Sequence, residues 1–309
     1  MLAYIFRRLL WTPVLLAAVS LVTFALGHYG PGDPVQVLMG QHTNPEVLAR
    51  IRHERGLDRP FFAQYAAYMG GVLRGDFGES FKFQGRPVNE LVFTKIGVSA
   101  QLGLAAIIIA VLAGIPLGLA AALKQGTWAD TATVSATLLF MSMPVFITAP
   151  VLIMVFVLWL RILPSSGWGG FFDPTIIMPA FVLALPSVAV LTRLMRASTL
   201  EVIGQDYIRT ARAKGLSEFV VQYRHVLRNA IIPVFTVIGL SLGTLVEGAF
   251  ITETMFGIPG VGRLGLDSLF ARDYPVIMAL TLIVAISFIV ANLLVDIGYA
   301  FLDPRIRYE

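Results

Sequence analysis

Long apolar stretches without a charged residue alternate with polar segments along this chain. Each stretch reaches the roughly 18 residues that a helix needs to cross the hydrocarbon core of a bilayer. The pattern therefore predicts an all-α polytopic membrane protein with six transmembrane helices. The six stretches are 9–27, 98–123, 131–160, 174–192, 229–246 and 274–295.

Prolines modify three of the predicted spans. The stretch 131–160 is longer than a bilayer requires and contains Pro144 and Pro150. Because proline removes a backbone donor and crowds the preceding turn, we expect this span to be kinked or tilted. Pro116 and Pro186 interrupt two other stretches, where neighbouring helices must satisfy the carbonyl groups that the prolines free.

The polar segments between the spans define the domain organisation. The segment between the first two spans has two stretches with helical spacing, Pro45–Leu57 and Phe61–Leu73, which suggest a small folded cap on the outer face. The predicted parts are a first transmembrane helix (1–28), an extracytoplasmic cap (29–95), a transmembrane core of five helices with an internal loop at 193–228 (96–302), and a cytoplasmic tail (303–309).

Basic residues predict the orientation. With both termini in the cytoplasm, the short internal segments hold most of the basic residues outside the long 28–95 loop, as the positive-inside rule requires. The first stretch is longer than the apolar region of a signal peptide, so we expect an uncleaved helix. The internal basic residues are Arg7, Arg8, Lys124, Arg305, Arg307 and those between Arg193 and Arg228.

Composition agrees with a lipid-facing surface and narrows the chemistry. Apolar residues make up 57% of the chain and charged residues 14%, against roughly 25% charged in soluble domains. The net charge of +4 is too small to indicate nucleic-acid binding, and no cysteine is present for a disulfide or a thiolate metal site. His28, His42 and His53 could suggest a metal site, but their spacing matches no compact ligand motif, so we predict none.

The internal loop 193–228 is the most informative polar segment. Its charges exclude a span, yet Leu200, Ile203, Tyr207, Ile208 and Ala211 have the spacing of one helical face. Gly215 then ends this helix, and Ser217 is a candidate N-cap for a second one. We predict a helix–turn–helix in which the small side chains of Thr210, Ala211 and Ala213 allow another protein to approach. The alternative is a solvated basic loop beside lipid headgroups.

A second group of candidates lies at the other side of the membrane. Glu247, with Thr244 nearby, falls close to the end of the fifth span, where a carboxylate is a candidate for a gate or for contact with a substrate. The alternative is a hydrated or paired carboxylate at the interface. The loop 251–273, which includes Glu253 and Pro259, is glycine-rich and half apolar, so it is either a re-entrant element over a pathway or an ordinary packed loop.

Enzymatic chemistry is absent from the sequence. A phosphate-binding loop needs a lysine directly after glycine, and none of Lys82, Lys95, Lys124 and Lys214 follows one. No paired carboxylates and no Ser, His and Asp arrangement share a predicted face. We therefore expect a non-catalytic membrane subunit without a bound cofactor or metal.

Several motifs resemble one family over essentially the whole length. The stretch Tyr207–Leu216 resembles the coupling loop of binding-protein-dependent ABC importer permeases. It has Arg209-Thr210-Ala211 where the general pattern has Glu-Ala-Ala, a variant that the peptide permeases share. Further matches are Pro31-Gly32-Asp33-Pro34, Gly75–Ser80, Glu253-Thr254, Gly257–Gly262, Arg272-Asp273-Tyr274 and Asp303–Tyr308. The chain looks most similar to the first permease subunit of oligopeptide and dipeptide importers.

The resemblance implies the fold, the partners and the site. The fold would be that of a type I ABC importer permease in the bacterial plasma (inner) membrane. Partners would be a homologous second permease subunit, two cytoplasmic ATPase subunits that bind ATP and Mg, an extracytoplasmic peptide-binding protein and a peptide substrate. In the family the coupling loop docks into the ATPase, which assigns that role to Tyr207, Ile208, Arg209, Thr210, Ala211, Arg212, Ala213, Lys214, Gly215 and Leu216.

Other functions remain open at this stage. Within the same family the cargo could be nickel or another small solute. An ion-coupled secondary transporter would need charged residues at the membrane midplane and inverted repeats. Glu247 is the only candidate for such a charge, and no internal repeat is evident. A structural or assembly role without transport is the third alternative.

Overall fold

The computed structural model describes residues 2–30, 44–54, 56–83, 85–243 and 249–302. Within these ranges the regular secondary structure consists of helices joined by turns and loops. The prediction of an all-α fold is confirmed there, since the only β feature described is an isolated bridge between Glu79 and Pro87. The elements are α1 (Leu2–Tyr29), α3 (Pro45–Glu54), α4 (Phe61–Val72), α5 (Val88–Leu123), α6 (Trp128–Ser142), α7 (Val145–Leu152), η1 (Ile153–Trp159), η2 (Pro174–Ile176), α8 (Ile177–Ile203), α9 (Asp206–Ala213), α10 (Glu218–Val220), η3 (Val221–Leu227), α11 (Arg228–Gly243), α12 (Phe250–Met255), α13 (Val261–Ala271) and α14 (Tyr274–Leu302).

Five continuous helical segments are long and apolar enough to span a membrane, and one bent pair makes a sixth span possible. This agrees with the six apolar stretches, although the helices extend past the charge-free runs. Helix α5 begins at Val88. Residues 88–95, which were predicted to be part of the cap, therefore belong to this helix. The continuous segments are Leu10–Tyr29, Val88–Leu123, Pro174–Ile203, Glu218–Gly243 and Tyr274–Asp296.

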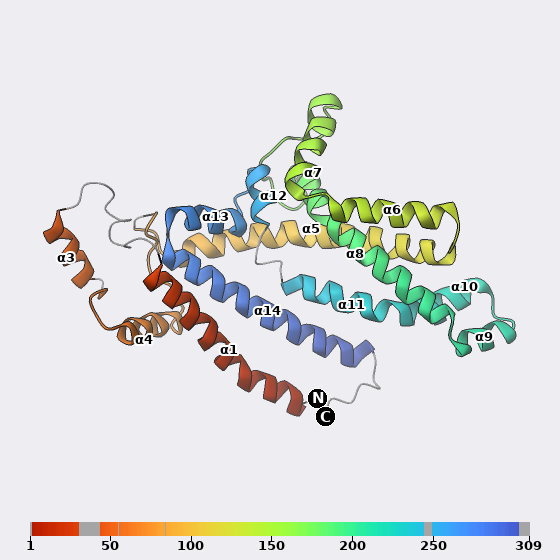
Figure 1. The fold of residues 1–309 in the computed structure, drawn as a ribbon, viewed down its shortest axis with the longest axis horizontal. Helices are drawn as coiled ribbons and strands as arrows, with labels where there is room; N and C mark the ends of the chain where they lie inside the picture. The colour runs from red at the N-terminus through yellow and green to blue at the C-terminus, as the bar shows by residue number, and fades with distance from the viewer. Residues whose placement is uncertain (1, 31–43, 55, 84, 244–248, 303–309) are drawn as a thin grey trace.

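The third predicted span is bent at Pro144, as its prolines predicted, and the bend is a break between two separate helices. It divides into α6 and the α7–η1 pair, whose axes differ by 106°. The break falls at Met143, which has an extended backbone, and Pro144, which stands at the N-cap of α7. A residue before proline is disfavoured in the helical region, so the chain leaves the helix there. In Figure 1, α7 turns away from the layer that contains α5, α6 and α8.

The centre of the bundle is the contact between α5 and α8. Buried small residues of α5, Ala106 and Ala110, belong to the same apolar cluster as Ala184, Val188 and Leu191 of α8. At Gly118 the backbones approach so closely that a Cβ would lie 2.7 Å from the Met195 Cβ atom. Small residues allow such an approach where lipid provides no hydrophobic drive between helices. The pair forms the rigid frame of the protein.

The remaining spans assemble around this frame. Helix α11 packs on α8 and α14, and α14 in turn packs on α1, which is the outermost span of the ribbon in Figure 1. Helices α8 and α14 run in the same direction across that view. Helix α9, which follows α8, therefore lies at the end of the bundle where α14 also ends. Helices α3, α4, α12 and α13 lie toward the opposite end.

Candidate functional site

Helix α9 stands at one end of the bundle, beyond the last turn of α8 (Figure 1). It has only 8 residues, which is about 12 Å of helix. Throughout the segment 204–219 every residue is exposed except Ile208 and Ala211. The segment is therefore a projecting surface that two side chains connect to the rest of the protein.

Those two side chains are inserted in a small apolar cluster. Ile208 is 0% exposed and Ala211 is 6% exposed, and both pack with Val221 and Val226 of η3. Burying an isoleucine side chain stabilises its position by about 1.5–3 kcal/mol. The helix is thus held from beneath by η3, which continues directly into α11.

A hydrogen bond also joins α9 to the beginning of α11. The Asn229 side-chain amide on α11 donates a hydrogen bond of 3.0 Å to the Tyr207 hydroxyl on α9. The Phe219 and Tyr223 rings contact each other at a tilt of 36°, with centroids 4.5 Å apart, and both remain exposed. The outward surface of the segment therefore combines basic side chains with two aromatic rings.

A left-handed glycine reverses the chain after α9. Gly215 has a φ of +79°, which favours glycine because it lacks a Cβ. The Leu216 N–H donates to the Ala211 carbonyl across this turn, which closes the helix. Arg212 also pairs with Glu218 across the turn at 2.8 Å, a half-exposed ion pair worth at most about 1 kcal/mol. The break expected at Gly215 is confirmed.

The structure alters three details expected for this loop. Its first part, up to Ile203, is the last portion of α8, and the helix breaks at Gly204 before α9 begins. Ala211 faces the apolar support, so only Thr210 and Ala213 remain available for a close approach from outside. Ser217 occupies the N-cap position of α10, but its side chain makes no capping bond.

The candidates at the opposite end separate into two groups. Thr244 and Glu247 lie outside the residues that the structure describes, so their assignment to a pathway stays a prediction. Glu253 lies on α12 and is 0% exposed. Pro259 is in the turn between α12 and α13, directly after the buried Ile258.

The carboxylate of Glu253 caps the beginning of α13. Its Oε2 atom accepts a 2.9 Å hydrogen bond from the Arg263 N–H, and its Oε1 atom accepts bonds from the Ala249 N–H at 3.1 Å and the Ser99 hydroxyl at 2.6 Å. The Ser99 oxygen in turn accepts from the Val261 N–H at 2.8 Å. A negative charge at a helix N-terminus is favourable because unpaired N–H groups and the helix dipole point toward it.

Glycine is required beside this carboxylate. A Cβ at position 260 would overlap the Glu253 carboxylate and would stand 2.5 Å from the Ser99 Oγ atom. The glycine-rich turn therefore lets α12, α13 and α5 meet around one buried acid. Both oxygens of Glu253 are used in this arrangement, which closes the carboxylate to solvent.

A second buried acid secures the other end of α13. Asp273, which is 0% exposed, follows this helix and precedes α14. Its carboxylate accepts a 2.5 Å bond from the Ser80 hydroxyl, one of 2.9 Å from the Phe81 N–H and one of 3.2 Å from the Lys82 N–H. Asp273 thus ties the segment before α5 to the α13–α14 corner.

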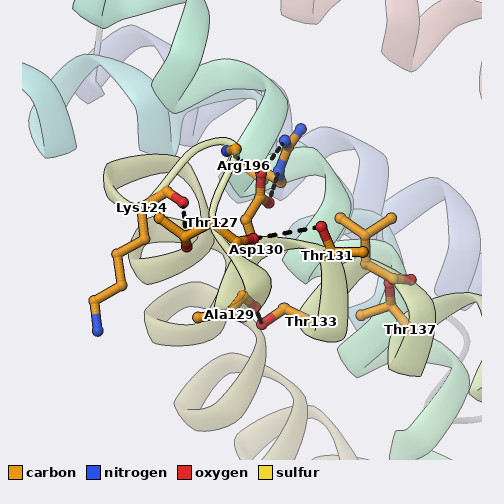
Figure 2. Close-up of polar contacts among 10 residues, drawn as sticks. Lys124, Thr127, Ala129, Asp130, Thr131, Thr133, Thr137 and Arg196 are labelled. Atoms are coloured by element: carbon orange, nitrogen blue, oxygen red, sulfur yellow. Dashed lines mark hydrogen bonds and ion pairs between the residues drawn. The ribbon is translucent and has the colours of Figure 1, made fainter.

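A third polar link lies near the α9 end of the bundle. Arg196 of α8 donates two hydrogen bonds to Asp130 of α6, at 2.6 and 2.8 Å, and Figure 2 shows the two side chains facing each other. The Gly126 N–H donates to the same carboxylate at 3.0 Å. Asp130 therefore joins the α5–α6 turn to the helix that carries α9.

Sequence reasoning missed these three polar links as a group. Ser99 is a single hydroxyl inside an apolar run, and Asp130 lies one residue outside another run, so neither gave a local signal. Asp273 was noted only within the Arg272-Asp273-Tyr274 motif. Each polar link joins residues far apart in the sequence, by 154 positions for Ser99 and Glu253.

His28 and His53, two of the histidines that the structure describes, make separate local contacts. The His28 ring packs against Phe24 and Phe61, and His42 lies outside the described residues. His53 lies 2.7 Å from Asp58, and this hydrogen bond holds the pKa of Asp58 below its usual value. Among the described residues no group of three or more His, Asp or Glu side chains could hold a metal ion.

Comparisons with known proteins place the chain in a family. The family described as binding-protein-dependent transport system inner membrane component matches residues 114–308, and its N-terminal counterpart matches residues 1–93. Among solved structures, an amino acid ABC transporter with histidines aligns over 70% of this chain and 94% of its own, with a TM-score of 0.47 and 16% identity.

Curated relatives cover the full length. The chain is 41% identical to the dipeptide transport system permease protein DppB of Escherichia coli strain K12, over 100% of both chains. It is 38% identical to the oligopeptide transport system permease protein OppB of Haemophilus influenzae, again over 100% of both. Together with the family match, this identity shows that the chain is a membrane permease subunit and not an enzyme, and that it belongs to the family of binding-protein-dependent transport system inner membrane components.

Proposed function

We propose that this chain forms half of the translocation pathway of an ATP-driven importer of dipeptides or oligopeptides. The observation that carries the proposal is the projecting helix α9, exposed throughout except for Ile208 and Ala211. The peptide cargo is supported by the names of the full-length relatives, a dipeptide and an oligopeptide permease. The segment Tyr207–Leu216 is the proposed contact with a cytoplasmic ATPase subunit.

The position of α9 explains how such a contact could move the membrane helices. It follows α8 after a two-residue break, and its buried side chains rest on η3, the beginning of α11. A displacement of α9 is therefore passed to two membrane spans at once. Asp130 and Arg196 extend the effect to α6, because they fasten that helix to α8. ATP and Mg would act on the partner subunits, and this chain would receive the motion.

The proposal includes an orientation and an assembly. Both termini and α9 would lie in the cytoplasm of a bacterium, with α12 and α13 at the extracytoplasmic end. A homologous second permease would complete the pathway, and an extracytoplasmic binding protein would deliver the peptide. The distribution of basic residues supports this orientation.

Glu253 and Pro259 have a structural part in this proposal. The buried carboxylate holds the re-entrant α12–α13 segment against α5 through Ser99. The segment would act as a rigid outer lining of the pathway, and Glu253 would shape it without touching the peptide. Thr244 and Glu247 remain the candidates for direct contact with the pathway.

Cross-linking tests the coupling role, because the chain has no cysteine of its own. We expect a cysteine at Arg209 or Lys214 to form a nucleotide-dependent cross-link to the ATPase subunit. A cysteine at the exposed Trp128 of α6, which begins near the same end of the bundle, is the matched control and should not. Equal cross-linking at all three positions would contradict docking through α9.

Transport assays test the cargo and the energy source. Uptake of a labelled dipeptide by cells should require this chain and the ATPase subunits together. Uptake that persists without the ATPase subunits would overturn the ATP-driven mechanism. Transport of nickel and not of peptides would leave the permease role intact and correct the cargo.

A further inference from the structure

Helix α4 directs its polar side chains into the protein and its apolar side chains outward, the reverse of a helix that faces water. The segment from Pro60 to Leu73 contains no charged residue. Its polar side chains Gln64, Tyr65 and Tyr68 fall on one helical face, and that face points into the protein. A helix at an aqueous surface presents the opposite pattern, with its polar face outward.

The contacts of the inner face show this orientation directly. The buried Gln64 amide donates to the Leu57 and Arg59 carbonyls, at 3.1 and 2.8 Å. The rings of Phe61, Tyr65 and Tyr68 all pack on Phe24 of α1. These three residues are spaced four and three positions apart, so α4 crosses α1 with one face at Phe24.

This crossing lies within the membrane-spanning part of α1. The Tyr65 hydroxyl forms a 2.7 Å hydrogen bond with the Ser20 hydroxyl and lies 3.3 Å from the Ala17 carbonyl oxygen. Ser20 is near the middle of the candidate span Leu10–Tyr29. At 1.5 Å of rise per residue, it lies roughly 13 Å from the Tyr29 end of that span. The Tyr65 side chain of α4 therefore reaches the middle of the apolar candidate span of α1.

The outer face of α4 is apolar and uncovered. It presents Phe62, which is 74% exposed, together with Ala63, Ala66 and Ala67, and ends at the exposed Leu73. Figure 1 shows α4 beside α1, at the margin of the bundle. Helix α1 carries exposed apolar side chains of its own at the same level, among them Val22 and Leu26.

We propose that α4 is embedded in the bilayer leaflet that adjoins the C-terminal end of α1, with its outer face against lipid acyl chains. The absence of charge, the inward polar groups and the depth of Tyr65 all require an apolar surrounding on that side. The segment between α1 and α5 is then partly a membrane element. It is anchored by lipid at α4 and by Asp273 at residues 80–82. The inference depends on α1 being a span and not on the transported cargo.

Spin labels on the full-length chain in lipid vesicles test this placement, again without background from native cysteines. Labels at F62C and A66C report on the outer face of α4. A label at L15C, exposed on α1, is the lipid control, and one at R86C, exposed between α4 and α5, is the water control. Relaxation of each label by oxygen, which concentrates in lipid, is compared with relaxation by a water-soluble nickel chelate.

We expect the oxygen-to-nickel ratio at Phe62 and Ala66 to match that at Leu15 and to exceed that at Arg86 several-fold. A ratio like that at Arg86 would place α4 in water and overturn the proposal. Low accessibility to both reagents would also overturn it, because it would mean that another protein surface covers this face. A clear difference between the oxygen-to-nickel ratios at L15C and R86C in the same vesicles confirms that the chain is inserted.

Discussion

The hydroxyl of Ser99 on α5 donates a 2.6 Å hydrogen bond to the carboxylate of Glu253 on α12, and neither side chain is open to solvent. This single contact joins the long helix α5 to the α12–α13 segment. Because the same carboxylate receives the N–H groups of Ala249 and Arg263, its loss would release both the turn and the beginning of α13.

We expect Glu253→Gln to destabilise the protein by about 1–3 kcal/mol, the cost of a buried polar group left with a mismatched partner. The glutamine NH₂ group cannot accept from the Arg263 N–H. Thermal unfolding in detergent measures the effect, with Glu90→Gln on the exposed side of α5 as the control. Ser99→Ala should destabilise the Glu253→Gln variant less than it destabilises the unmodified protein, because both residues belong to one hydrogen-bond network. Full additivity would show that the two residues act separately.

Ala211→Leu and Ala213→Leu should have different consequences, although both lie on α9. Ala211 is packed on Val221 and Val226, so the larger side chain overfills the support at a cost of about 1–3 kcal/mol. Hydrogen exchange of the α9 amides should increase for this variant. Ala213 is exposed, so its replacement should leave exchange unchanged and weaken binding of the ATPase subunit. Equal exchange in the two variants would contradict the packing of α9 on η3.

The ion pair of Asp130 and Arg196 should matter more than that of Arg212 and Glu218. Asp130 is 5% exposed and accepts three hydrogen bonds, so Asp130→Asn should cost about 1–3 kcal/mol, as for hydrogen bonds to charged groups. Glu218→Gln removes a half-exposed surface pair and should cost less than about 1 kcal/mol. Unfolding measurements on both variants compare them directly. A larger loss for Glu218→Gln would reverse this ranking.

Two glycines of α5 provide a matched test of helix packing. Gly118 lies against α8, where an added Cβ would stand 2.7 Å from the Met195 Cβ atom. An added Cβ at Gly97 would meet no atom of another helix within 4 Å. We expect Gly118→Ala to destabilise by about 1–3 kcal/mol through overpacking. Gly97→Ala should be neutral or stabilising by up to about 1 kcal/mol, because alanine favours the helix. Thermal unfolding separates the outcomes, and equal shifts would exclude a close α5–α8 contact.

The α9 surface that we propose for coupling could be predicted in outline but not in orientation. Gly215 is a local signal, since a turn with positive φ needs glycine wherever it occurs, and the helix before it was expected. The packing of Ala211 on Val221 and Val226 decides which small residues of α9 face outward. The sequence pattern could not choose between Ala211 and Ala213 because their environment is set by η3.

The sequence by itself determined the all-helical membrane character, the approximate location of the apolar spans and the family, because hydropathy and motifs are local properties of the chain. Only the tertiary structure decided that the third apolar stretch bends by 106°, that α4 crosses α1 at Phe24, and that Glu253 and Asp273 are buried acids that hold α13 at both ends. These depend on partners distant in sequence. A carboxylate has the same intrinsic chemistry in every loop, and the surrounding N–H and O–H donors determine whether it faces a pathway or holds a helix in place.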